Sequence, residues 1–221
     1  MKTIYILGHC NTTLCITLDS IYSLYKDTVN VEIISNMPEE DNKFGHLEYL
    51  HNGLKITEIF HDKFSDYSGK KFLLAAVTIK TKQIILDFFR NNYKVQKHDY
   101  HSIIHPLAII ANGVSIGNGS NISPGSIFAP YVKIGSFVTI NRGVTIGHHA
   151  SIGEFSRVNP GANIGGSCKI GSGVTIGMGA TVIDHINIGN NAFIGAGSLV
   201  NKDVPENTMV YGVPARNIRT L

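Results

Sequence analysis

The sequence has little of what marks several large classes of protein. Its 221 residues include only three cysteines, Cys10, Cys15 and Cys168, which form no CxxC motif and no even disulfide framework. The net charge of +3 is small, and Lys and Arg are scattered, so nothing points to a nucleic-acid partner. The first apolar run, in MKTIYILGHC, has the length of a strand and is too short for a signal peptide or a membrane span. We therefore expect a globular cytoplasmic protein with reduced thiols and no membrane association.

Two parts of the chain follow different patterns. In the first, apolar runs at about 3–8, 30–35 and 71–79 predict strands. Helical spacing predicts one helix over about 12–26, capped by Asn11 or Thr12, and a second after residue 80. Strands that alternate with helices predict a small α/β domain with a parallel sheet.

The second part is a repeat of six residues. Written in sixes, residues 105–200 end all sixteen units with an apolar residue, and nine of the units are followed by Gly. Two positions before the apolar residue stands Ala, Ser, Val, Cys or, once, Ile. Such hexapeptide repeats predict a parallel β-helix in which both of these residues point inward and Gly accommodates the corner. One six cannot bury its own face, so the coils must stack as a solenoid.

Two adjacent histidines interrupt the repeat in TINRGVTIGHHASIGEFSRV, residues 139–158. Together with HSIIHPLAII and IGAGSLVNKDVPENTMVYGVPARNI, this segment resembles the sialic acid O-acetyltransferase and nucleotide-amino-sugar N-acetyltransferase family of hexapeptide acyltransferases. The resemblance implies a Rossmann-like α/β substrate-binding domain over 1–100. It implies a left-handed β-helix acetyltransferase domain with a C-terminal tail over 101–221, and a homotrimer with active sites between subunits.

The family motif reads Asn-x-Gly-x-x-x-acid-His-acid, and its His is the general base. Asn141, Gly143 and His148 fall on these positions, and His149 falls on the second acid. The resemblance therefore makes Asn141 and His148 catalytic residues, with His148 as the base, facing outward at a corner. An amine or hydroxyl that attacks a thioester must lose a proton, and neutral imidazole accepts protons near working pH. Backbone N–H groups at Gly-rich corners could hold the charge that develops on the thioester oxygen. A solvated corner histidine is the alternative for both rings, and for His149 an orienting role stays open.

Two positions depart from the family motif. Gly147 replaces the acid before the base, and the nearest carboxylate, Glu154, is the candidate partner of His148. Arg157 replaces a second family histidine nine residues after the base. Arginine cannot act as a base at neutral pH, so a CoA or substrate contact and a plain surface arginine are the two interpretations.

Further binding residues follow from the family precedent. Acetyl-CoA is the implied co-substrate, with the pantetheine near corner residues Gly166, Met178 and Ala196. The ending GVPAR matches a Gly-x-Pro-Ala-basic pattern, so Arg216 is a candidate for the nucleotide phosphates or else a surface arginine.

A nucleotide-linked sugar is expected at the N-terminal loop LGHCNTT and after the second strand. The loop keeps one of the family's glycines, and the candidates for substrate binding are Gly8, His9, Asn11 and Asn36.

The expected function is transfer of an acetyl group from acetyl-CoA to the amine of a nucleotide-linked amino-deoxy sugar in surface-glycan or polysaccharide biosynthesis. O-acetylation of a sugar such as sialic acid is the alternative. A metal hydrolase resembling the γ-type carbonic anhydrases needs a second histidine five residues on, where Gly153 and Glu154 stand, and His185 is isolated. We expect no metal. A catalytically inactive binding or assembly protein is the remaining alternative.

Overall fold

The computed structural model describes residues 2–9, 11–36 and 53–221. The chain divides into two compact units, Met1–Pro106 and Leu107–Leu221. Within the described residues, no helix is long and apolar enough to cross a membrane.

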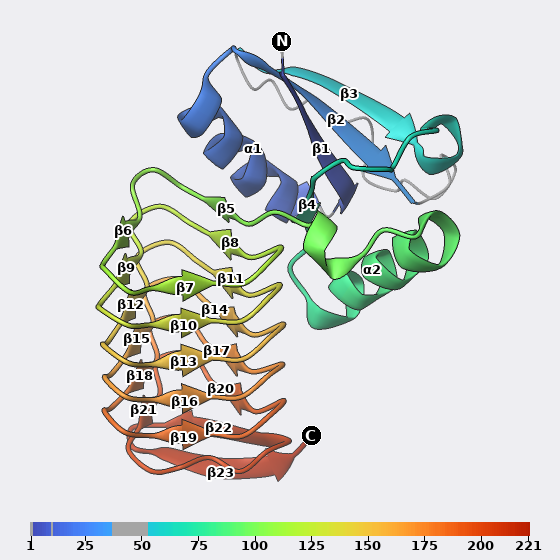
Figure 1. Ribbon diagram of the computed structural model, residues 1–221. Coiled ribbons are helices and arrows are strands. Elements are labelled where there is room, and N and C mark those ends of the chain that lie inside the picture. The colour runs from blue at the N-terminus through green and yellow to red at the C-terminus, as the bar shows by residue number, and fades with distance from the viewer. Residues whose placement is uncertain (1, 10, 37–52) are drawn as a thin grey trace. The chain divides into compact units, whose positions relative to one another are not determined.

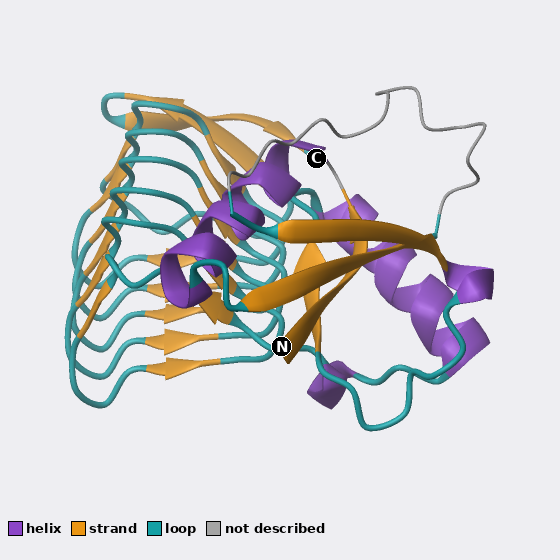
Figure 2. Ribbon diagram, turned by 90° about the horizontal axis from the view of Figure 1, so that it is seen from above, coloured by secondary structure: helices purple, strands orange, loops and turns teal. Residues whose placement is uncertain are grey.

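The first unit is a parallel four-stranded sheet with a helix on each face, which confirms the predicted α/β domain (Figures 1 and 2). The strand order is β3-β2-β1-β4. The elements in chain order are β1 (Lys2–His9), α1 (Asn11–Tyr25), β2 (Val29–Ser35), β3 (Lys55–Phe60), η2 (His61–Lys63), β4 (Phe72–Ala75), α2 (Ile79–Tyr93), η3 (Lys97–Asp99) and β5 (Ile103–Ile104).

Alternation along the strands explains why both faces are covered. Ile6 of β1 belongs to a buried cluster with Leu14 and Leu18 of α1. On the other face, the ring of Tyr67 lies against Phe72 of β4 and Phe89 of α2, with centroids 6.0 Å apart in each pair. Successive side chains of a strand point to opposite faces, so a short apolar run supplies two cores.

Two details differ from the prediction for this unit. Strand β3 was not predicted, because this edge strand has an exposed or half-buried side chain at every position and no apolar run. The predicted strand over 71–79 ends at Ala75. Thr78 caps α2 there, and its side-chain oxygen accepts a hydrogen bond from Thr81 N–H at 3.1 Å.

The second unit is the predicted left-handed parallel β-helix (Figure 1). Each six contributes one short strand, and the strands stack into three parallel faces. Face 1 holds β8 (Asn121–Ile122), β11 (Thr139–Ile140), β14 (Arg157–Val158), β17 (Thr175–Ile176), β20 (Phe193–Ile194) and β22 (Thr208–Gly212), with β23 (Ala215–Thr220) antiparallel at its end. Face 2 holds β6 (Ile109–Ile110), β9 (Ile127–Phe128), β12 (Thr145–Ile146), β15 (Asn163–Ile164), β18 (Thr181–Val182) and β21 (Leu199–Val200). Face 3 holds β7 (Ser115–Ile116), β10 (Lys133–Ile134), β13 (Ser151–Ile152), β16 (Lys169–Ile170) and β19 (Asn187–Ile188).

The apolar residue that ends each six fills the interior. From Ile122 to Val200 every one of these residues is buried, as predicted. Ile110 is exposed and Ile116 is half-buried, because β6 and β7 are the end strands of face 2 and face 3. Full burial of one such side chain contributes about 1.5–3 kcal/mol, so stacking distributes the stabilisation evenly along the solenoid.

The glycine that recurs at the first position of a six is required by the close stacking of coils and not by a positive φ. Positive φ occurs at the third position of a six, for example 67° at Gly143 and 59° at His149. Gly147, at the first position, has no positive φ, but a Cβ there would lie 2.4 Å from the nitrogen of Gly166 and 2.6 Å from the carbonyl carbon of Gly165. The glycine is therefore needed because the backbone of the next coil lies so close.

Candidate active site at a corner of the β-helix

His148 lies at the corner that joins β12 on face 2 to β13 on face 3. Hydrogen bonds to the coils on both sides fix this corner. His149 N–H donates to the carbonyl of Pro130 at 3.0 Å, and Ser167 N–H donates to the carbonyl of His148 at 2.8 Å. Both histidine side chains are exposed, so they project away from the interior of the β-helix.

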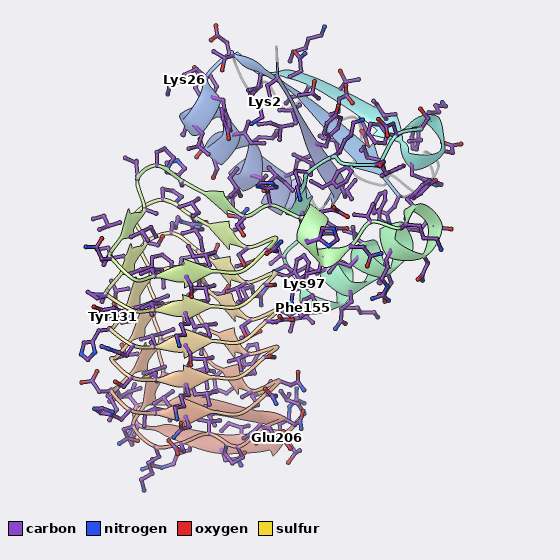
Figure 3. The ribbon with its side chains drawn as sticks, in the orientation of Figure 1. Lys2, Lys26, Lys97, Tyr131, Phe155 and Glu206 are labelled. Atoms are coloured by element: carbon purple, nitrogen blue, oxygen red, sulfur yellow. The ribbon has the colours of Figure 1, made fainter. Side chains whose placement is uncertain are left out.

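The two rings form a hydrogen-bonded pair. Nδ1 of His148 lies 3.1 Å from Nδ1 of His149, and the ring planes are nearly perpendicular at 84°. One nitrogen must carry the proton and the other must accept it. On the preceding coil, the ring of Tyr131 packs against His149 with centroids 5.0 Å apart, and Figure 3 shows Tyr131 at this edge of the β-helix. His149 thus occupies the place of the partner that the sequence left open for His148.

Gly166 forms the floor beneath the His148 ring. A Cβ on Gly166 would lie 2.9 Å from Nε2 and 3.0 Å from Cε1 of that ring. The N–H of Gly166 donates to Oδ1 of Asp184 at 2.5 Å, so it is not open to a ligand in this structure. The predicted pantetheine contact at Gly166 stays a prediction, and the structure gives this residue a packing role beside the candidate base.

The three predicted catalytic residues lie at three different corners of one coil. Asn141 follows β11 at the corner of faces 1 and 2, His148 lies between faces 2 and 3, and Glu154 precedes β14 at the corner of faces 3 and 1. Figure 3 shows this separation, with Tyr131 at one edge of the β-helix and Phe155, the neighbour of Glu154, at another. One chain alone therefore does not bring the three side chains together.

Asn141 has a structural partner. Its side-chain Nδ2 donates to the carbonyl of Val158 on the next coil, at 3.2 Å.

Arg157 projects from β14 on face 1, the one face that does not meet at the His148 corner. The side chain is half-buried, and its Nε has no hydrogen-bond partner among the described residues. Burial lowers the pKa of the Arg157 guanidinium. A half-buried, partly desolvated guanidinium is suited to an anionic group of a ligand or a partner.

The remaining predicted CoA residues, apart from Gly166 and Arg157, divide between two places. Met178 and Ala196 are exposed at the corner of faces 1 and 2, the same corner as Asn141. Arg216 is exposed on β23, where its Nη1 donates to the carbonyl of Ala215 at 3.3 Å. Neither place adjoins the His148 corner within one chain.

In the first unit, the predicted substrate residues follow β1 and β2. Gly8 is buried with φ 62°, at a break in the β1–β4 register, and a Cβ there would lie 2.6 Å from Cδ1 of Ile85. Its backbone is thus covered by α2. Asn36 follows β2 directly and is half-buried, while the side chains of His9 and Asn11 lie outside the described residues.

Metal ligands do not gather in the described part of the chain. No group of three or more His, Cys, Asp or Glu side chains there could hold a metal ion. His185 is exposed at the corner two coils after His149.

Comparison with known proteins agrees with this architecture. A family model described as "Bacterial transferase hexapeptide (six repeats)" matches residues 149–184 and 167–202. Both matched ranges lie within the six-residue repeat. No curated protein matches its sequence significantly.

Solved structures resemble this chain over nearly its whole length. The acetyltransferase domain of PglB from Neisseria gonorrhoeae aligns with a TM-score of 0.80 at 18% identity, covering 99% of this chain and 100% of the other. A mutant perosamine N-acetyltransferase from Caulobacter crescentus, in complex with CoA and GDP-perosamine, aligns with a TM-score of 0.74 at 20% identity, covering 99% and 97%. WeeI from Acinetobacter baumannii aligns with a TM-score of 0.75 at 22% identity, covering 98% and 100%. The resemblance seen in the sequence therefore extends to both units, and this chain has the fold of these three proteins.

Proposed function

We propose that this protein is an acyltransferase that moves the acetyl group of acetyl-CoA to the amine of a nucleotide-linked amino-deoxy sugar, with His148 as the general base. The observation that carries the proposal is the His148 corner itself. An exposed imidazole is held between His149 and Gly166, and its Nε2 forms no hydrogen bond within the described residues.

The chemistry suits such a nitrogen. As the amine nitrogen of the acceptor bonds to the thioester carbonyl carbon, it must lose a proton, which Nε2 of His148 accepts. The carbon–sulfur bond then breaks, and CoA leaves as the thiol or thiolate. No covalent enzyme intermediate is needed, because holding the two substrates together supplies much of the rate.

The distribution of candidate residues supports a site shared between copies of the chain. Asn141, His148 and Glu154 lie at three different corners of one coil, and Arg157 projects from the face opposite His148. These residues can act together only where the corner of one copy meets a face or corner of another. A homotrimer with three such sites, the assembly implied by the family resemblance, satisfies this requirement.

The comparisons support the substrate classes. Structures with the same fold include the PglB acetyltransferase domain in complex with acetyl coenzyme A and a perosamine N-acetyltransferase in complex with CoA and GDP-perosamine. A shorter match, covering 54% of this chain with a TM-score of 0.52, is an N-acyltransferase from Bacillus cereus in complex with dTDP-4-amino-4,6-dideoxyglucose and Coenzyme A. An amino sugar carried on a nucleotide is therefore the proposed acceptor, with the first unit as its binding domain.

The alternative acceptor is a sugar hydroxyl, as in sialic acid O-acetylation. One observation favours it: Gly8, the one glycine kept from the phosphate-binding loop, is buried beneath Ile85. A phosphate cannot approach that backbone unless α2 moves.

A thiol-release assay with acetyl-CoA tests both. The acceptors are UDP-, dTDP- and GDP-linked 3-amino and 4-amino sugars and free sialic acid. We expect activity on one nucleotide-linked amino sugar and a loss of about 10²-fold or more in His148→Ala. His185→Ala, which removes an exposed corner histidine two coils away, is the matched control and keeps full activity. Activity confined to sialic acid would move the acceptor to a hydroxyl, and an active His148→Ala would overturn the role of His148.

A further inference from the structure

We infer that His149 is a positioning residue that holds His148 in its reactive tautomer, by accepting a hydrogen bond from Nδ1–H of His148 through its own Nδ1. This inference rests on the proposed function and assigns to a neutral imidazole the place that an acid holds in the family motif.

The geometry requires one proton between the two nitrogens. Two Nδ1 atoms 3.1 Å apart form a hydrogen bond only when one is protonated and the other is bare. If His148 carries that proton, its Nε2 is bare and can accept a proton from a substrate. The reverse arrangement would leave Nε2 of His148 protonated and unable to act as a base.

The surroundings leave Nε2 accessible to a substrate in the first arrangement. Gly166 is the residue packed beneath this nitrogen, and its N–H is donated to Asp184. This N–H therefore does not occupy the lone pair that accepts the substrate proton. The same stacking keeps the His148 ring from sinking toward the next coil, so its bare nitrogen stays at the surface of the corner.

His149 is itself held in place. Its φ of 59° and the bond from its N–H to Pro130 set the direction of the side chain, and the Tyr131 ring packs against it from the preceding coil. The exposed Nε2–H of His149 is left to donate to water. The other titratable groups on this edge are the phenol of Tyr131, the carboxylate of Asp184 and the ring of His185.

Gly147 has no side chain, so the acid that precedes the base in the family motif is missing here. The backbone of Gly165 and Gly166 lies close to this residue. The orienting group therefore comes from the other side of His148, where His149 stands.

A neutral His149 and a carboxylate partner should affect the basicity of His148 differently. When His148 takes up the substrate proton, the hydrogen bond to neutral His149 stabilises the cation less than a carboxylate would. A carboxylate at 149 should keep the tautomer and make His148 more basic. The acid limb of the kcat/KM profile then moves to higher pH by about one unit.

Three variants test the inference in the full-length protein. His149→Phe keeps a ring against Tyr131 but has no acceptor, and Phe137 and Phe155 show that Phe tolerates positive φ at this position of a six. His149→Asp restores an acceptor as a carboxylate. His185→Phe makes the same change at a corner with φ 64° and is the matched control.

We expect His149→Phe to lower kcat by about 10-fold or more, with little change in the KM for acetyl-CoA. His149→Asp should retain activity with the acid limb shifted upward, and His185→Phe should match the wild type. An unchanged kcat and pH profile in His149→Phe would overturn the inference.

A second readout is independent of turnover. In protein labelled with 15N-histidine, NMR near pH 8 should show His148 protonated at Nδ1 and His149 protonated at Nε2, with signals assigned from His148→Ala and His149→Phe. His148 protonated at Nε2 in the wild type would overturn the inference even in an active enzyme. If no acceptor is turned over, the proposed function fails, and the NMR result still decides the tautomers.

Discussion

Substitution of Gly166 by Ala separates a packing role from a ligand-binding role. The added Cβ would lie 2.9 Å from Nε2, 3.0 Å from Cε1 and 3.4 Å from Cδ2 of the His148 ring. Carbon atoms in favourable contact are about 3.5–4.0 Å apart, so the ring must move by about 0.5–1 Å. Displacement of a catalytic group by 1 Å can reduce the rate by about 10²-fold. We therefore expect kcat to fall by about 10-fold to 10²-fold.

The fold should tolerate this change. Gly166 does not have positive φ, so Ala fits the backbone. The change also lowers the entropy of the unfolded chain, which is worth about 0.4–1 kcal/mol. The free energy of unfolding, measured in urea, should therefore change little or increase.

The kinetic assay uses a matched control. Ser172 holds the same corner position in the next six, and its N–H donates to Oδ1 of Asn190 at 2.9 Å, as Gly166 N–H donates to Asp184. Ser172→Ala should keep the kcat and the KM of the wild type. If Gly166→Ala instead raises the KM for acetyl-CoA at constant kcat, Gly166 contacts the pantetheine. Its proposed role in positioning the His148 ring by packing is then refuted.

Three further outcomes follow from burial and packing. Gly147→Ala places a Cβ against the backbone of the next coil, so overpacking should lower the free energy of unfolding by about 1–3 kcal/mol, measurable in urea; an unchanged midpoint would contradict the close stacking. Arg157→Met removes a half-buried guanidinium whose Nε is unpartnered in the described residues. The unfolding midpoint should therefore stay the same or rise, while the KM of acetyl-CoA or of the acceptor rises. If neither KM changes, Arg157 does not bind a substrate. Ile164→Ala opens a cavity at an inward position that is 3% exposed, and calorimetry should show a loss of about 2–5 kcal/mol, against about 0.5–1.5 kcal/mol for Ile164→Val.

The sequence was sufficient to predict the β-helix and its register, because every six repeats the same inward residue. It was not sufficient for β3, whose residues are half-buried or exposed at the edge of the sheet. The role of the recurring glycine was also misjudged, because it depends on contact between coils and not on local turn geometry.

The sequence did not reveal the contacts of His148 and His149 with neighbouring coils, for a related reason. Contacts between coils join residues 18 positions apart, as between Gly166 and Asp184 or Thr145 and Asn163. Counting 18 from His148 leads to Gly166, and counting 18 from Tyr131 leads to His149, so this period would have found both contacts. The Nδ1–Nδ1 bond would still have been missed, because it depends on the side-chain rotamers of two adjacent residues.

The regularity of the coil also explains which positions of a six can carry functional side chains. The fourth and sixth positions of each six face the interior, and the first lies against the next coil. The second and third positions are exposed or half-buried at most corners, with buried exceptions that include Ser136, Phe137, Gly166 and Gly173. The third takes positive φ with residues as different as Gly143, Tyr131 and His149. Two adjacent histidines at these positions therefore cost the solenoid little, and they place two rings in contact at its surface. The repeat that fixes the backbone leaves these two positions of most corners free to carry function.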